Sequence, residues 1–269
     1  MPQFKYRTIA ISDIHLGSVD SKAELLNNFL KANTCEHLLL VGDIVDGWQM
    51  KKKLINWPSS HVEVVHQLLR IANSGTTVEY IVGNHDEFLR PFIKHDINFG
   101  TIKISNHVIH VGATGRRFLV IHGDMFDGIS SLAPWLSYLG DTLYNLILRI
   151  NSKFNALRHY FGMGYWSISK FLKFQVKSAV NFLFQFEQNV SNHARNFEVD
   201  GVICGHIHHL EIKKIDTIWY LNSGDWVESC SALLETFDGE WAAIMISETG
   251  NLVQIASLTN EQWNSNENI

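Results

Sequence analysis

The feature that most constrains this chain is a recurring pattern in which a buried strand is followed at once by polar side chains. Val78-Glu79-Tyr80-Ile81-Val82 is a short β-branched and apolar run typical of a buried strand, and it leads directly into Gly83-Asn84-His85-Asp86. Open α/β sheets bind ligands outside the carboxyl ends of their strands, so we expect the polar residues to converge on one site. The residues that follow the other expected strands are Asp13, His15, Asp43, His122, His206 and His208.

The order of the expected elements favours an α/β fold. Strands over 6–12, 37–41 and 78–82 alternate with amphipathic helices over 22–32 and 62–72, which predicts a parallel sheet with right-handed crossovers. Further strands are expected over 107–111, 117–121, 201–204, 211–215, 219–221, 231–236 and 241–246. The last four of these runs are typical of antiparallel strands, with Asp238-Gly239 as a hairpin turn.

The composition changes between residues 129 and 197, where the pattern becomes helical. This segment holds 14 of the 31 aromatic residues, and its seven basic and two acidic side chains make it about +5 in a chain of −5. We therefore predict a core formed by 1–128 and 198–258, a helical cap over 129–197, and a polar, frayed tail over 259–269. Such charge asymmetry often marks a surface that meets an anionic partner.

Bulk properties exclude several classes of protein. With 269 residues, 46% of them apolar, the chain is long enough for a sizeable core. The net charge of −5 argues against a general nucleic-acid binder, and the three scattered cysteines argue against a disulfide scaffold. Residues 1–12 lack the apolar core of a signal peptide, and no run approaches the roughly 18 residues of a membrane span. We expect a cytoplasmic protein, or one bound peripherally to the inner membrane face.

The polar residues at the strand ends are suited to metal binding. Four histidines, two aspartates and one asparagine, without thiolates, suit Mn, Fe(II), Zn or Co, and they are too many for one closed tetrahedral site. Two ions about 3.5–4 Å apart that share a carboxylate would use all seven. His85, beside Asn84, is then placed to protonate the leaving oxygen of a phosphate ester, and either Asp86 or Asp46 could orient an imidazole.

Five motifs, in this order, resemble the calcineurin-like metallophosphoesterase superfamily across residues 6–247. They are Asp13-Ile14-His15, Gly42-Asp43-Ile44-Val45-Asp46, Gly83-Asn84-His85-Asp86, His122, and Gly205-His206-Ile207-His208. The resemblance implies a four-layer α/β/β/α sandwich. It also implies one metal held by Asp13, His15, Asp43 and His208, and a second held by Asp43, Asn84, His122 and His206.

A narrower resemblance is to the UDP-2,3-diacylglucosamine hydrolase branch of lipid A biosynthesis. It rests on Gly42–Trp48, His122-Gly123-Asp124, the helical insert and Gly224-Asp225-Trp226. The resemblance implies manganese, cleavage of a pyrophosphate linkage, and a helical lid that seats acyl chains. One departure is His85, because that branch carries an arginine after the asparagine, where it is expected to hold substrate phosphate. The candidate substrate-binding residues are Trp48, Arg158, Lys170, Lys173 and Lys177.

The expected function is hydrolysis of a phosphate or pyrophosphate ester of an amphipathic, UDP-2,3-diacylglucosamine-like substrate, with His85 and Asp86 as catalytic residues. One alternative is a nucleotide phosphodiesterase or phosphatase whose cap is only structural, since aromatic residues at helical spacing usually form a core of their own. A second is a metal-binding scaffold without catalysis. The expected partners are a phosphorylated amphipathic small molecule and an anionic membrane surface touched by the cap.

Overall fold

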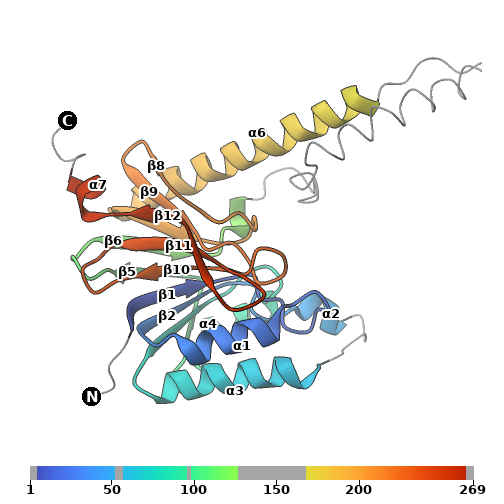
Figure 1. The fold of residues 1–269 in the computed structure, drawn as a ribbon, viewed down its shortest axis with the longest axis vertical. Helices are drawn as coiled ribbons and strands as arrows, with labels where there is room; N and C mark the ends of the chain where they lie inside the picture. The colour runs from blue at the N-terminus through green and yellow to red at the C-terminus, as the bar shows by residue number, and fades with distance from the viewer. Residues whose placement is uncertain (1–4, 52–56, 96–97, 127–167, 265–269) are drawn as a thin grey trace, which may run out of the picture. The chain divides into compact units, whose positions relative to one another are not determined.

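The computed structural model describes residues 5–51, 57–95, 98–126 and 168–264 (Figure 1). The chain divides into two compact units, one formed by Met1–Phe126 with Asn189–Ile269 and the other by Asp127–Gln188. The first unit contains two β-sheets and the helices that cover one of them. Most of the predicted cap lies outside the described residues, so its boundaries at 129 and 197 stay a prediction.

A seven-stranded sheet carries the first half of the chain. Its strand order is β12-β11-β10-β1-β2-β3-β4. The neighbours β1-β2-β3-β4 are parallel, as the alternation of strands and helices predicted, whereas β10, β11 and β12 add antiparallel pairs at the other side of β1. The strands are β1 (Tyr6–Ile11), β2 (Cys35–Val41), β3 (Thr77–Ile81), β4 (Lys103–Ser105), β10 (Ser231–Glu235), β11 (Trp241–Ile246) and β12 (Leu252–Leu258).

A five-stranded sheet has the order β5-β6-β7-β9-β8. Here β6, β7 and β9 are mutually parallel neighbours, and the outer strands β5 and β8 pair antiparallel with β6 and β9. The expected antiparallel arrangement of β9 therefore holds only toward β8. The strands are β5 (His107–Val111), β6 (Arg117–Ile121), β7 (Gly201–Cys204), β8 (Glu211–Ile215) and β9 (Ile218–Asn222).

Alternation along the central strands creates two separate cores. Ile9 and Ile11 of β1 face the helices α1 (Ala23–Ala32) and α3 (Ser59–Asn73), which lie side by side on one face of the sheet (Figure 1). Ala10, between them, faces the second core, which includes Val120 and Ile203 of the other sheet. Because successive side chains of a strand point to opposite faces, the C-terminal parts of β1 (9–11) and β2 (38–41) serve both cores and are apolar. The helix–sheet–sheet packing is that of a metallophosphoesterase sandwich.

The remaining helices are short, with one exception. Helix α6 (Ile168–Ala194) runs through much of the predicted helical insert, and none of the described helices is long and apolar enough to cross a membrane. The short helices are α2 (Gly47–Lys51), η1 (Glu87–Leu89), α4 (Arg90–Ile93), η2 (Asp124–Phe126), η4 (Arg195–Phe197) and α7 (Asn260–Asn264).

The C-terminal region differs from the sequence prediction. Residues from 259 onward were expected to be polar and frayed, but α7 places Trp263 in the core between the sheets, where only 7% of it is exposed. Its indole lies 5.3 Å from that of Trp219, measured between ring centroids. A single large aromatic residue thus anchors a polar segment, and β12 precedes it as an additional edge strand.

Candidate metal centre and active site

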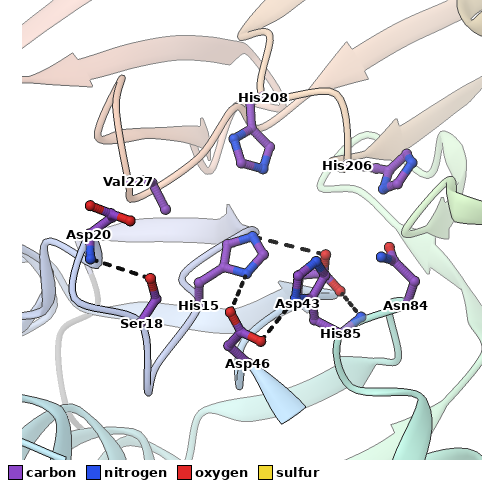
Figure 2. Close-up of a pocket in the computed structure, with 10 residues that line it drawn as sticks. All are labelled: His15, Ser18, Asp20, Asp43, Asp46, Asn84, His85, His206, His208 and Val227. Carbon is purple, nitrogen blue, oxygen red and sulfur yellow. Dashed lines mark hydrogen bonds and ion pairs between the residues drawn. The ribbon is translucent and has the colours of Figure 1, made fainter. Parts of the chain in front are cut away.

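The predicted metal ligands lie together where the strands of the two sheets end, and Figure 2 shows five of them: His15, Asp43, Asn84, His206 and His208. Asp13 and His15 follow β1, Asp43 follows β2, and Asn84 follows β3. His122 follows β6, and His206 and His208 follow β7 in the second sheet. Since the strands that carry them are parallel within each sheet, their carboxyl ends share an edge, and the two edges face each other across the site.

One group of ligand atoms consists of Asp13, His15 and His208. Asp13 Oδ1 is 3.2 Å from His208 Nε2 and 3.9 Å from His15 Nε2. The other oxygen of Asp13 accepts a hydrogen bond of 2.9 Å from the backbone N–H of His206. The Asp13 carboxylate therefore links the β1 loop to the β7 loop while one of its oxygens faces two imidazoles.

A second group consists of Asp43, His122 and His206. Asp43 Oδ2 is 3.3 Å from His122 Nε2 and 4.0 Å from His15 Nε2, so the same oxygen faces both groups. His122 Nδ1 is 2.9 Å from the carbonyl oxygen of Val41, which fixes the tautomer with Nδ1 protonated and leaves Nε2 free as a ligand. Asp43 has the position expected of a carboxylate shared between two ions.

The donor set fits a pair of divalent ions. Imidazole nitrogens and carboxylate oxygens from the two groups approach within 4.8 Å of one another inside each group. The side-chain oxygen of Asn84 is buried and meets no hydrogen-bond donor among the described residues. A buried amide oxygen without a donor is costly, and a metal ion at this place would satisfy it. The seven predicted ligands are thus brought together, and their chemistry suits borderline divalent metals.

Five of these residues have a left-handed backbone. The φ angles are 52° at Asp13, 51° at His15, 54° at Asp43, 73° at His206 and 54° at His208. This region is uncommon for residues other than glycine, and such residues cluster at functional sites. The conformation turns each loop sharply at the end of its strand, so that two ligands separated by one residue both face the site.

The glycines of the motifs are required by close packing against the ligands. A methyl group at Gly42 would lie 2.7 Å from His122 Cβ, and one at Gly205 would lie 2.5 Å from Asp13 Oδ2. Gly83 is equally tight, because its added carbon would lie 2.7 Å from the backbone nitrogen of Asp43. The sequence suggested only a role in turn geometry for these glycines. In the structure their lack of a side chain also lets the predicted ligands pack directly against the backbone.

Electrostatics keep the carboxylates ionised. Burial alone would raise the pKa of Asp13, but His208, His122 and His15 lower it overall. Burial would likewise lower the pKa of the histidines, yet Asp43 raises the pKa of His122 to about 10 and Asp13 raises that of His208 to about 9. His122 and His208 thus bind a proton where each would bind a metal ion, whereas burial lowers the pKa of His15 overall.

The two candidate orienting carboxylates have different positions. Asp46 Oδ1 is 3.1 Å from His85 Nδ1, whereas Asp86 is fully buried and accepts hydrogen bonds from the backbone N–H groups of Ile44 and Val45. Burial raises the pKa of Asp86 to about 7. Asp86 therefore supports the loop after β2, and the geometry gives no support to the predicted catalytic role. Asp46 is the carboxylate that orients His85.

The predicted substrate-binding residues are spread over several parts of the chain. Trp48 stacks on the imidazole of His85, with ring centroids 4.0 Å apart, and is 43% exposed. Lys170, Lys173 and Lys177 belong to α6, and Lys177 is exposed. Arg158 lies outside the described residues. The role of these residues in substrate binding stays a prediction.

A pocket of about 300 Å³ opens over the ligand groups (Figure 2). Besides His15, Asp43, Asn84, His206 and His208, its lining includes Asp46 and His85. Three further residues were not anticipated from the sequence: Ser18, Asp20 and Val227. They follow the first motif and Trp226 in loops, where neither periodicity nor ligand spacing could single them out.

Comparison of this chain with known proteins found similar solved structures but no similar curated sequence. Among solved structures, it is similar to vacuolar protein sorting 29 from Cryptosporidium parvum, at 10% identity and a TM-score of 0.49, covering 96% of this chain and 100% of the other. It is similar to the phosphoesterase YfcE from E. coli, at 14% identity and a TM-score of 0.48, covering 93% and 97%.

The sequence profile of the family described as calcineurin-like phosphoesterase matches residues 6–210, which is well over half of the chain. The match runs from β1 to just beyond His208 and so includes every predicted metal ligand. The family binds divalent metals, in agreement with the His and Asp groups at the strand ends. The chain belongs to the calcineurin-like phosphoesterase family.

Proposed function

We propose that this protein is a dinuclear metal-dependent hydrolase of a phosphate or pyrophosphate ester in an amphipathic substrate similar to UDP-2,3-diacylglucosamine. The observation that carries the proposal is the Asp43 carboxylate in the pocket lining, whose Oδ2 lies 3.3 Å from His122 Nε2 in one ligand group and 4.0 Å from His15 Nε2 in the other. One ion would be held by Asp13, His15, Asp43 and His208, and the other by Asp43, Asn84, His122 and His206. Manganese is our choice among the borderline metals that such ligands accept.

The chain's own residues supply the remaining parts of the mechanism. When bound, a pair of divalent ions polarises the phosphate and acidifies the attacking water. His85 donates a proton from Nε2 to the oxygen of the leaving group, since its Nδ1 is engaged by Asp46. The backbone N–H of His85 meanwhile donates to Asp43 Oδ1 at 2.8 Å, which couples the position of the acid to that of the shared ligand.

The amphipathic character of the substrate rests on the helical insert. On the described part of α6, Val180 and Phe184 are 57% and 60% exposed, and Lys177 is exposed one turn before Val180. These positions are spaced i, i+3 and i+7, so they share one face of the helix. An exposed face with apolar and basic residues suits an acyl chain or an anionic membrane surface better than water alone. Peripheral contact of the cap with a membrane is part of the proposal.

A second candidate function is hydrolysis of a nucleotide or other soluble phosphodiester. It is favoured by His85, because the lipid A branch that the motifs resemble has an arginine at this position. In this case the cap would shape the pocket without contacting acyl chains, and hydrolysis would not depend on chain length.

The decisive experiment compares a UDP-linked diacyl sugar with a generic aryl phosphodiester, both with manganese. We expect wild type to hydrolyse both and the lipid far faster, and Asn84→Ala to abolish both activities because it removes a metal ligand. Asn251→Ala, in an exposed loop, is the matched control and should behave as wild type. Hydrolysis of the aryl ester alone would exclude the lipid substrate and favour the soluble phosphodiester, and no hydrolysis of either would remove the enzymatic proposal.

A further inference from the structure

Three consecutive residues, Asp46, Gly47 and Trp48, all contact His85. Asp46 Oδ1 lies 3.1 Å from His85 Nδ1, and the backbone N–H of Gly47 donates to the carbonyl oxygen of His85 at 3.1 Å. Trp48 lies against the face of the imidazole, with an interplanar angle of 31°. The start of α2 thus contacts the side chain, the backbone and the ring face of one residue.

Three side chains share the restraint of the His85 ring. The bond to Asp46 fixes one nitrogen but lets the imidazole pivot about the line that joins Nδ1 to Oδ1. The indole of Trp48 removes this freedom on one side, and the His15 ring, nearly perpendicular with its centroid 4.5 Å away, lies against the imidazole as well. Only Nε2 then remains free to meet a substrate.

Gly47 is the residue that permits the stack. A methyl group there would lie 2.7 Å from the carbonyl oxygen of His85 and 2.6 Å from the ring of Phe88. The backbone of α2 can therefore approach the His85 loop closely enough for Trp48 to reach the imidazole. Trp48 is also absent from the described lining of the pocket, although His85 and Asp46 belong to it.

We propose that Trp48 is a positioning residue that holds the imidazole of His85 in the plane needed for proton donation, and is not itself a contact for substrate. This inference rests on the proposed role of His85 in hydrolysis and adds to it. Orientation matters because a small misplacement of a catalytic group can cost about 100-fold in rate, and a positioned general acid contributes about 100-fold to 10,000-fold.

The kinetic test compares two methyl phosphodiesters with manganese. The leaving group is 4-nitrophenolate in one ester and methoxide in the other. Nitrophenolate leaves without a proton, whereas methoxide requires one. We expect Trp48→Ala to lower kcat about 10-fold to 100-fold for the methoxide ester and less than about 2-fold for the nitrophenyl ester. Trp48→Phe, which keeps an aromatic face, should restore most of the loss. Phe237→Ala, with a similarly exposed aromatic residue in the β10–β11 turn, is the control.

A double-mutant comparison separates positioning from substrate binding. If Trp48 acts through His85, Trp48→Ala will have no further effect in a His85→Ala background. If Trp48 binds substrate, its effect will persist in that background and will be equal for the two esters. An effect of Trp48→Ala that persists in the His85→Ala background, or one that is equal for the two esters, would overturn the proposal.

A measurement without turnover tests the same contact. In metal-free protein with labelled histidine, the His85 ring signals, assigned with His85→Ala, should be displaced upfield by the indole. They should move downfield in Trp48→Ala and stay in place in Phe237→Ala. Signals that do not move in Trp48→Ala would refute the proposal. If wild type hydrolysed neither ester, the proposed function would fail separately, and this measurement would still decide whether Trp48 holds the His85 ring against its indole.

Discussion

Replacing Gly83 by alanine should disable the proposed metal centre although it replaces none of the ligands. The added carbon would lie 2.7 Å from the backbone nitrogen of Asp43 and closer still to Asp43 Oδ1. Carbon in van der Waals contact normally keeps about 3.5 Å, so Asp43 has to move by about 1 Å. Gly83 does not have a left-handed φ, so alanine would be allowed there by the backbone and the effect is one of space alone.

The magnitude follows from what Asp43 contacts. A shift of about 1 Å breaks the 2.8 Å bond from the His85 N–H and the 3.3 Å approach to His122 Nε2. Overpacking of this kind costs about 1–3 kcal/mol of folding free energy. Loss of support for a metal ligand costs about 10–100-fold in affinity, and Asp43 serves both groups, so we expect at least about 100-fold.

The assay is calorimetric titration of Mn²⁺ into metal-free protein, with chemical denaturation of the same samples. Gly115→Ala is the control, since its φ is 82° but nothing lies within 4 Å of the added carbon. It should lose about 1 kcal/mol of stability through backbone strain and bind Mn²⁺ normally. Equal affinity of Gly83→Ala and wild type would show that the glycine does not protect the position of Asp43.

Three other outcomes follow from the same structure. Asp43 and Asp13 raise the pKa values of His122 and His208 to about 10 and 9, so both imidazoles are protonated at pH 8 in metal-free protein. Manganese binding at pH 8 should therefore release protons, and the affinity should increase as the pH rises. Calorimetric titration in buffers of different ionisation enthalpy measures the number of protons released. Trp263→Ala should cost about 3–5 kcal/mol in denaturant unfolding, since the indole is buried in the core, and a cost under about 1 kcal/mol would place α7 outside it. Burial would raise the pKa of Glu235, but hydrogen bonds from His110, Thr8 and the Ala113 N–H lower it overall. The ionised carboxylate therefore stabilises the fold above its unfolded pKa of about 4.3, and this stability is lost as the pH falls through the lower folded pKa. Glu235→Gln should reduce this loss of stability in acid denaturation.

The sequence predicted most of the central architecture because the strands carry strong signals. The C-terminal parts of β1, β2 and β3 are buried on both faces, so each strand ends in an apolar run, and the helices between them show clear amphipathic spacing. The edge strands were harder. β4 has only three residues, and the first four residues of β12 are exposed, so neither shows the pattern of a buried strand.

The sequence predicted that the candidate ligands would lie together, but it did not predict the contacts that support them. Asp13, His15 and His208 follow strands at fixed spacings, which topology brings to one edge. The choice of Asp46 over Asp86 as partner of His85 depends on where two loops from different strands meet, and this information is not local in the sequence. The stacking of Trp48 on His85 is not local in the sequence either, because the two residues are 37 positions apart.

Backbone conformation and metal chemistry select the same residue types at this site. A left-handed backbone is tolerated by aspartate and histidine several-fold more often than by most residues, and it is a severe outlier for β-branched ones. The loops at the ends of β1 and β2 need that conformation to bond to each other, as in the 2.9 Å bond from the His15 N–H to the Asp43 carbonyl oxygen. In the proposed function, a side chain there must both accept the strained backbone and bind a divalent ion. Aspartate and histidine meet both demands, so each motif has only a few possible residues at its ligand positions, and this double demand makes the motifs informative in a single sequence.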